Sequence, residues 1–153
     1  MDANRLEHLK MVQAAITRMA QNSFVLKGWS VTLTTGILAA ALGQKQQAFA
    51  WLGLVPALAF WGLDSFYLRL ERRFRALHDD VCAAFGTTAP ATFSMNTANV
   101  TSPPPSWWRL LFSKTVAGLH APLVAVIIGI ALWMNRDAFV AVISCMAQAV
   151  RGR

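Results

Sequence analysis

Residues 49–85 read FAWLGLVPALAFWGLDSFYLRLERRFRALHDDVCAAF, and the rest of the chain is organised around this stretch. Its first half, Ala50 to Leu63, carries no charge, whereas its second half is charged and amphipathic. The apolar residues of the second half recur every three or four positions, as Leu70, Phe74, Leu77, Val81 and Phe85. A helix from Phe49 to Phe85 would be about 55 Å long, against about 30 Å for the hydrocarbon core of a bilayer. We therefore predict one long helix that crosses a membrane with its first half and stands in water, as a stalk, with its second.

The composition of the chain is that of a membrane protein. Of its 153 residues, 56% are hydrophobic and 14% are charged, and the mean hydropathy is +0.43. An average soluble domain has about 25% charged residues. The length leaves room for about three spans. We predict an all-α integral membrane protein with about three transmembrane helices, a long second helix that extends into the cytoplasm, and an N-terminal amphipathic helix.

Six segments follow from the distribution of apolar, charged and loop-forming residues. They are an N-terminal amphipathic helix at 1–23, a transmembrane hairpin at 24–68, the stalk at 69–86, a Pro/Thr/Asn linker at 87–106, a third transmembrane helix at 107–134 and an apolar tail at 135–153. Pro56 is expected to bend the second span, and Gly86 to end the stalk. Residues 135–137 are expected to stop the third span. Residues 138–150 are fewer than the roughly 20 that a span needs, so they should lie at the interface or return partway.

The N-terminal helix, expected over residues 3–22, has one apolar stripe, made of Leu9, Val12, Ile16 and Met19. Either the membrane surface or the apolar stripe of the stalk could cover it. The opposite face mixes acidic, basic and uncharged residues, whereas helices that lie on membranes are strongly basic on their polar face. We therefore expect the N-terminal helix to pack on the stalk.

The first span carries small residues at four-residue spacing, namely Gly28, Thr32, Gly36 and Ala40. In lipid, such a row lets two helix backbones approach closely. Two interpretations remain open: the row docks on the Gly53/Ala57 side of the second span, which we favour, or it joins subunits of an oligomer.

Lys27 and Asp64 are expected a few residues inside the same edge of adjacent antiparallel spans. An isolated charge there is costly, so an ion pair between them is predicted, with a proton or ion path through Asp64 as the alternative. His120, in the third span, is expected to make a hydrogen bond between helices. The charges that follow Asp64 are predicted to form a solvated or lipid-facing collar, made of Arg69, Glu71, Arg72, Arg73 and Arg75.

The basic residues are unequally distributed along the chain. Four Lys and Arg residues precede or include Lys27 and six lie between Arg69 and Lys114, whereas the turn at Lys45 has one and the tail has three. Basic residues favour the cytoplasmic side. The N-terminus, the stalk and the linker are therefore expected in the cytoplasm, and the turn and the tail outside.

The sequence contains no recognisable catalytic or metal-binding motif. No nucleophile has a placed base, no His or Cys spacing suits a metal, and no phosphate loop occurs. The net charge of +7 comes from arginines beside apolar runs, which suits anionic lipid headgroups better than nucleic acid. We expect a protein that is not an enzyme and has no cofactor. Its expected partners are an anionic bilayer, further copies of itself, and a cytoplasmic protein or small-molecule signal.

Three segments resemble a family of small, largely uncharacterised bacterial multi-pass inner-membrane proteins. They are LKGWSVTL at 26–33, FWGLDSFYLRLERRFRALHDDV at 60–81 and FSMN at 93–96, so the resemblance covers most of the chain through the third span. The apolar tail after Arg136 departs from that pattern. The resemblance implies a bacterial membrane effector associated with defence or mobile-element systems.

These observations favour a non-enzymatic inner-membrane protein, an oligomer that perturbs or permeabilises the membrane in response to a cytoplasmic signal. The alternatives are a membrane scaffold or anchor for a cytoplasmic partner, and a small transporter or channel. Transport would require more polar residues along the spans and an internal repeat, and neither is visible.

Overall fold

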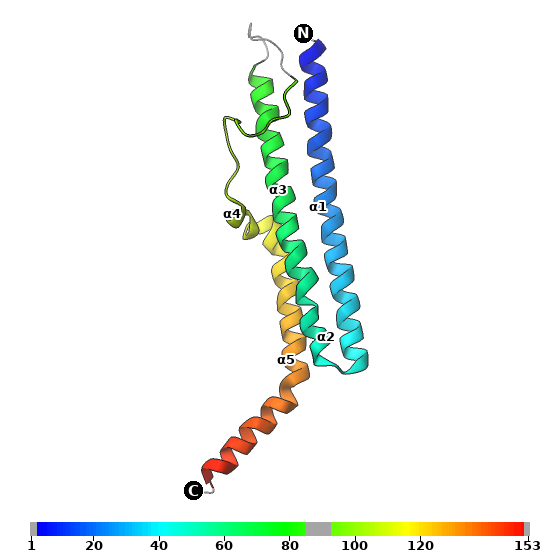
Figure 1. The fold of residues 1–153 in the computed structure, drawn as a ribbon, viewed down its shortest axis with the longest axis vertical. Coiled ribbons are helices and arrows are strands. Elements are labelled where there is room, and N and C mark those ends of the chain that lie inside the picture. Colours follow the sequence, from blue (N-terminus) through cyan, green and yellow to red (C-terminus); the bar gives the residue numbers. More distant parts are fainter. Residues whose placement is uncertain (1–2, 85–92, 152–153) are drawn as a thin grey trace.

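Two long antiparallel helices form the axis of the molecule, and a third helix lies against one end of them (Figure 1). The computed structural model describes residues 3–84 and 93–151, with side chains for 3–84 and 93–136. Its helices are α1 (Ala3–Gln44), α2 (Gln47–Leu52), α3 (Leu54–Ala83), α4 (Trp107–Leu111) and α5 (Lys114–Arg151). The described residues contain no strand, so the predicted all-α class is confirmed.

α1 is a single uninterrupted helix of 42 residues. The prediction of a separate helix over residues 3–22, followed by a distinct span, is therefore wrong. No Gly or Pro occurs between Ala3 and Lys27, so nothing in the sequence breaks the helix there. The buried positions keep to one helix face across the expected boundary, at intervals of one or two helical turns, as Val12, Ala15, Ser23, Ser30 and Thr34. One face of one helix thus makes the contacts of both the stalk and the membrane segment.

The second long helix is interrupted near its start, at Gly53, which separates α2 from α3. In a continuous helix the N–H of residue 56 would bond the carbonyl of Leu52, and Pro56 has no N–H. The expected long helix is thus interrupted at one residue, Gly53, whose φ of −59° and ψ of −22° stay helical, and the interruption coincides with the hydrogen bond that Pro56 removes. α3 ends at Ala83, and the predicted stop at Gly86 lies outside the described residues.

The turn between the two long helices consists of two residues. α1 continues to Gln44 and α2 begins at Gln47, which leaves Lys45 and Gln46 between them. Lys45 has a φ of 54°, in the left-handed region, so the chain reverses within these two residues.

The third span is formed by α4 and α5, which are separated by Phe112 and Ser113. α5 continues as a helix to Arg151, so the prediction that residues 135–137 stop it is wrong. Asn, Arg and Asp reduce helix propensity only slightly, and a change from apolar to polar sequence does not by itself end a helix. The position of residues 138–150 relative to a membrane remains a prediction.

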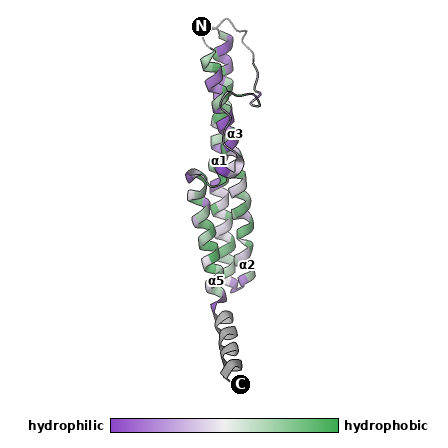
Figure 2. Cartoon of the chain, turned by 90° about the vertical axis from the view of Figure 1, so that its left-hand side faces the viewer, coloured by the Kyte–Doolittle hydropathy of each residue, from purple (hydrophilic) through white to green (hydrophobic). Residues whose placement is uncertain are grey.

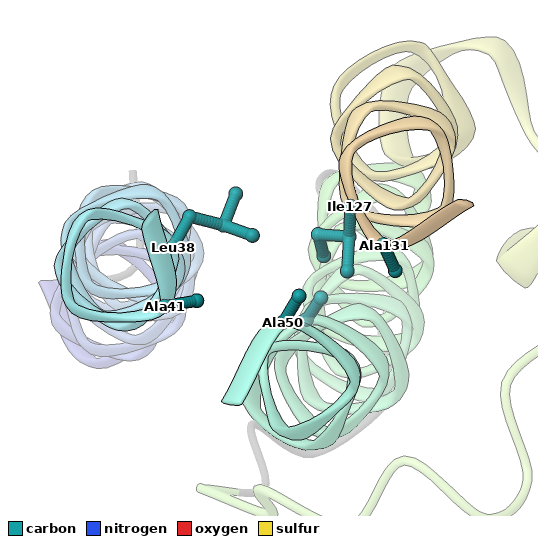
Figure 3. Close-up of a cluster of buried hydrophobic side chains, with 6 residues drawn as sticks. Leu38, Ala41, Ala50, Ile127 and Ala131 are labelled. Atoms are coloured by element: carbon teal, nitrogen blue, oxygen red, sulfur yellow. The ribbon is translucent and has the colours of Figure 1, made fainter. Parts of the chain in front are cut away.

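Within the described residues, three helical segments are long and apolar enough to cross a membrane: α1, Gln47–Ala83 and Lys114–Arg136. The apolar residues gather toward the hairpin turn, whereas the N-terminal end of the α1–α3 pair is more polar (Figure 2). Near the turn, the helices enclose an apolar cluster of Leu38, Ala41, Ala50, Ala57, Ile127 and Ala131 (Figure 3). Four of its six members are alanines. Such small side chains allow helix backbones to approach closely in lipid.

The predicted packing of the N-terminal residues on the stalk is confirmed: the N-terminal half of α1 lies along the C-terminal half of α3, which contains the stalk residues from Arg69 onward. Val12 and Ala15 on α1 are buried, as are Ala76 and Leu77 on α3, and the two helices run side by side there (Figure 1).

The described part of the linker is held against the stalk. His8 Nε2 lies 3.0 Å from the carbonyl oxygen of Ser94, and the ring of His8 lies 5.8 Å from that of Phe93. Further along, the backbone N–H of Thr101 donates to Asp80 Oδ2 at 2.9 Å. The linker therefore fixes where α4 and α5 begin relative to α3.

Candidate functional site

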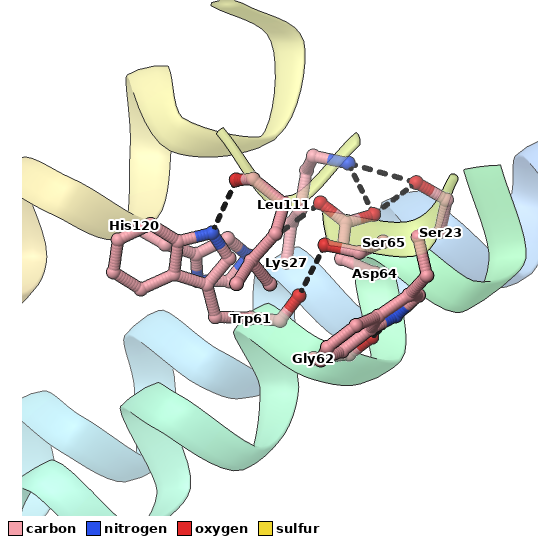
Figure 4. Close-up of polar contacts among 9 residues, drawn as sticks. Ser23, Lys27, Trp61, Gly62, Asp64, Ser65, Leu111 and His120 are labelled. Carbon is pink, nitrogen blue, oxygen red and sulfur yellow. Dashed lines mark hydrogen bonds and ion pairs between the residues drawn. The ribbon is translucent and has the colours of Figure 1, made fainter. Parts of the chain in front are cut away.

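Asp64 is a fully buried carboxylate at the level where the α1–α3 pair meets α5 (Figure 4). Its Oδ1 accepts hydrogen bonds from Lys27 Nζ at 2.7 Å and from the Ser23 hydroxyl at 2.5 Å. The predicted ion pair between Lys27 and Asp64 is confirmed. The Asp64 side chain is 0% exposed, whereas that of Lys27 is 25% exposed. The ammonium group thus lies at the edge of the cluster, on a flexible stem that reaches the surface.

His120 brings the third helix into this cluster. Its ring is fully buried, and Nε2 lies 3.5 Å from Asp64 Oδ2. A hydrogen bond between fully charged groups would be about 2.7–2.9 Å long. The two oxygens of Asp64 therefore differ: Oδ1 has two close donors, while Oδ2 has no hydrogen-bond partner among the described residues. The predicted hydrogen bond between helices through His120 is not formed at this distance, but the ring does face a residue of another helix, Asp64 on α3.

Indole groups hold α3, α4 and α5 together around His120. The ring of Trp61 stacks on that of His120, with centroids 6.1 Å apart and planes at 13°. Trp61 Nε1 donates to the carbonyl oxygen of Leu111 at 2.8 Å, and Trp107 Nε1 donates to that of Gly62 at 3.4 Å. Both tryptophans are half-buried and satisfy their N–H groups. The two hydrogen bonds attach α4 to α3, and the ring stacking attaches α5 to α3. Together they hold His120 beside Asp64.

Two buried hydroxyls continue the polar face of α1 beyond the cluster. Ser30 and Thr34 follow Lys27 by one and two helical turns, and both are fully buried. Neither hydroxyl oxygen has a hydrogen-bond partner in the described part of the chain. An unpaired buried hydroxyl costs about 1–3 kcal/mol, and such groups usually bind ordered water. Beyond Thr34 the same face continues with Leu38, which belongs to the apolar cluster.

The small-residue stripe lies on the outside of the bundle. Gly28, Thr32, Gly36 and Ala40 are all exposed, and a Cβ placed on Gly28 or Gly36 would meet no described atom within 4 Å. The interpretation that the stripe docks on the second span is therefore wrong. The physical reason is rotational: α1 turns Ser30, Thr34 and Leu38 toward its neighbours, and the stripe lies on the opposite face.

The predicted collar is not uniformly solvated. Arg75 is exposed and pairs with Glu71 at 2.5 Å, but Glu71 itself is buried, which contradicts its place in a solvated collar. Glu71 follows Asp64 by seven residues, or two turns, so it faces α1 as Asp64 does. The other three members, Arg69, Arg72 and Arg73, are half-buried. Glu71 therefore belongs to the contact between α1 and α3, whereas Arg75 lies on the surface.

The chemistry available to this cluster is electrostatic. Among the described residues, no group of three or more His, Cys, Asp or Glu side chains could hold a metal ion. What the cluster does contain is one carboxylate, one ammonium and one imidazole, each from a different helix and all in contact across a buried interface. This arrangement can bind the three helices together.

The sequence allowed Lys27 and Asp64 to be predicted as partners. It did not indicate that His120 lies beside Asp64. Ser23 was also missed, although polar residues at 23, 27, 30 and 34 recur at helical spacing within an apolar run, which is a readable signal for a polar buried face. For His120 the only signal was that it is the one ionisable residue deep in the third span. The distance along the chain from Asp64 gives no indication that they meet.

No family model, no curated protein sequence and no solved structure matches this chain.

Proposed function

We propose that the chain is a non-enzymatic protein of the bacterial inner membrane that assembles into a homo-oligomer and acts on the membrane when its cytoplasmic stalk receives a signal. The observation that carries this proposal is the position of the small-residue stripe. Gly28 and Gly36 expose the backbone of α1 on the outer face of a helix that is long and apolar enough to span a membrane. In lipid, such a face gains most by packing on another helix. A second copy of the chain supplies that helix.

The signal would act on the stalk. The distribution of Lys and Arg favours a cytoplasmic stalk. A groove of about 320 Å³ lies on it between α3 and the proline run of the linker, lined in part by Arg72, Arg75, Asp80 and Pro103–Pro105. Because α1 and α3 both continue from the stalk into the membrane segment, a ligand in this groove would be connected to the stripe through continuous helices.

The test compares Gly36→Leu with Gly129→Leu, both in otherwise unchanged protein. Gly129 is the matched control, because it is also an exposed glycine with no described atom within 4 Å of an added Cβ, but it lies on α5. We expect Gly36→Leu to leave the fold intact and to shift the protein from oligomer to monomer, with Gly129→Leu unchanged. The measurements are crosslinking in native membranes and the mass of the particle in lipid nanodiscs. A wild-type monomer, or an oligomer equally stable in Gly36→Leu, would refute assembly through the stripe.

A membrane anchor for a cytoplasmic partner is the second candidate, and the groove beside the proline run favours it. A chain that remains monomeric but binds a partner through Arg72 and Arg75 would support this alternative. A transporter or channel has less support, because the polar face of α1 ends at the apolar cluster and does not continue to the hairpin turn.

A further inference from the structure

We propose that Asp64 and His120 form a proton-binding site inside the bundle, and that a proton taken up there replaces Lys27 as the counter-charge of Asp64. This inference concerns the charge state of the cluster and does not depend on assembly through the stripe.

The cluster has room for one more proton in its bonding pattern. Asp64 Oδ2 and both ring nitrogens of His120 lack a hydrogen-bond partner among the described residues, although all three atoms are buried. Nε2 already faces Oδ2 at 3.5 Å. A charged imidazolium would shorten that contact to about 2.7–2.9 Å and would satisfy Oδ2. Addition of one proton to His120 would therefore convert this contact into an ion pair between Asp64 and His120.

The charge balance explains why Lys27 would then leave. With a neutral His120, the charges of Lys27 and Asp64 cancel. One added proton leaves the cluster with a net positive charge, which is costly within a membrane segment. Lys27 is the member that can relieve it, because its side chain is 25% exposed and its four-carbon stem can carry the ammonium to the membrane surface. Asp64 and His120, both fully buried, cannot leave in this way.

The ionisable groups around His120 permit this exchange. From α3 it faces Asp64, and beyond that carboxylate lies Lys27 from α1. The basic residues nearest in sequence, Arg109 on α4 and Lys114 on α5, are both exposed. Trp61 presents the face of its indole to the ring of His120, and such a face attracts a cation. The surroundings thus contain one anion and one aromatic face that favour the charged ring, opposed by the ammonium of Lys27.

The step is a simple proton transfer. A hydronium ion from the aqueous phase on the stalk side gives its proton to Nδ1 of His120 and becomes water, while Nε2–H donates to Asp64 Oδ2. Lys27 keeps its charge and moves outward. No covalent bond of Lys27 or Asp64 is formed or broken. Since Lys27 and Ser23 together hold α1 to Asp64, the exchange loosens α1 from α3 and strengthens the hold of α5 on α3.

The test uses the full chain in lipid nanodiscs. An acylating reagent modifies lysine amines, and mass spectrometry gives the modification of Lys27 relative to the exposed Lys45 of the same molecule. We expect this ratio to rise as the pH is lowered, by at most about tenfold per pH unit, because one proton is exchanged. The His120→Gln variant should show no such rise. The control His78→Gln, which changes a histidine of the stalk, should behave as wild type.

A second measurement needs no variant at the site. In protein labelled with ¹⁵N-histidine, the signal of His120, identified after His8→Gln and His78→Gln changes, should shift from neutral to charged over the same pH range in which Lys27 becomes reactive. A His120 ring that stays neutral throughout would overturn the proposal. So would a ring that titrates while the Lys27 ratio stays constant, or an equal rise of that ratio in His120→Gln. The Gly36→Leu protein should give the wild-type result, so failure of assembly and failure of proton exchange are distinguishable.

Discussion

Lys27→Met and Asp64→Asn remove opposite halves of one ion pair, and the structure predicts that they cost unequal amounts of stability. Lys27→Met leaves a fully buried carboxylate with Ser23 as its one close donor. Breaking a buried pair in this way costs about 3–5 kcal/mol. Asp64→Asn instead leaves an ammonium that is already 25% exposed and can move into the headgroup region. Its cost should be that of the lost buried hydrogen bonds, about 1–3 kcal/mol.

The double variant Lys27→Met/Asp64→Asn separates the charge effect from loss of contacts. It leaves no unpaired charge, so it should be more stable than Lys27→Met alone, and its loss should be well below the sum of the two single losses. The free energy of unfolding of all four proteins is measured in the same bicelles. Equal costs for the single variants, a larger cost for Asp64→Asn, or additivity in the double variant would refute the reasoning.

Two further predictions concern orientation and packing. A reporter fused after Ser94 should be cytoplasmic and one inserted at Gln46 periplasmic, because basic residues flank the first position; a periplasmic reporter at Ser94 would reverse the orientation. Ile127→Ala, at a fully buried position of the apolar cluster, should lower the free energy of unfolding by about 2–5 kcal/mol. The control Val126→Ala, at a side chain 53% exposed, should change it by about 0.5 kcal/mol or less. Equal losses would show that Ile127 does not lie in the core.

The sequence was a good guide to those parts of the fold that depend on local pattern. The apolar runs predicted the membrane segments, and matching apolar stripes predicted that residues 3–22 pack on the stalk. Lys27 and Asp64 could be paired because two antiparallel spans joined by a short turn place residues at equal distance from that turn side by side. Each of these inferences needs only helical geometry and the length of one connection.

The errors arose where rotation or long connections decide the outcome. The stripe of Gly28 and Gly36 suggested close packing, but whether it faces α3 depends on the rotation of α1. The bonds of Ser23 and Lys27 to Asp64 favour the observed rotation, as does the burial of apolar residues such as Val12. His120 reaches Asp64 across a linker whose path cannot be read from its composition. The division of α1 at residue 22 failed because polarity changes there while helix propensity does not.

The continuity of α1 has a mechanical consequence. With 42 residues and no break, this helix is about 63 Å long and acts as a lever. A tilt of ten degrees about one end would displace the other end by about 11 Å over that length. The only interruption in its partner, at Gly53, lies beside the hairpin turn, far from the stalk tip. If α1 tilts about its hairpin end, beside Gly53, the turn stays in place and the N-terminal end of α1 moves sideways the most.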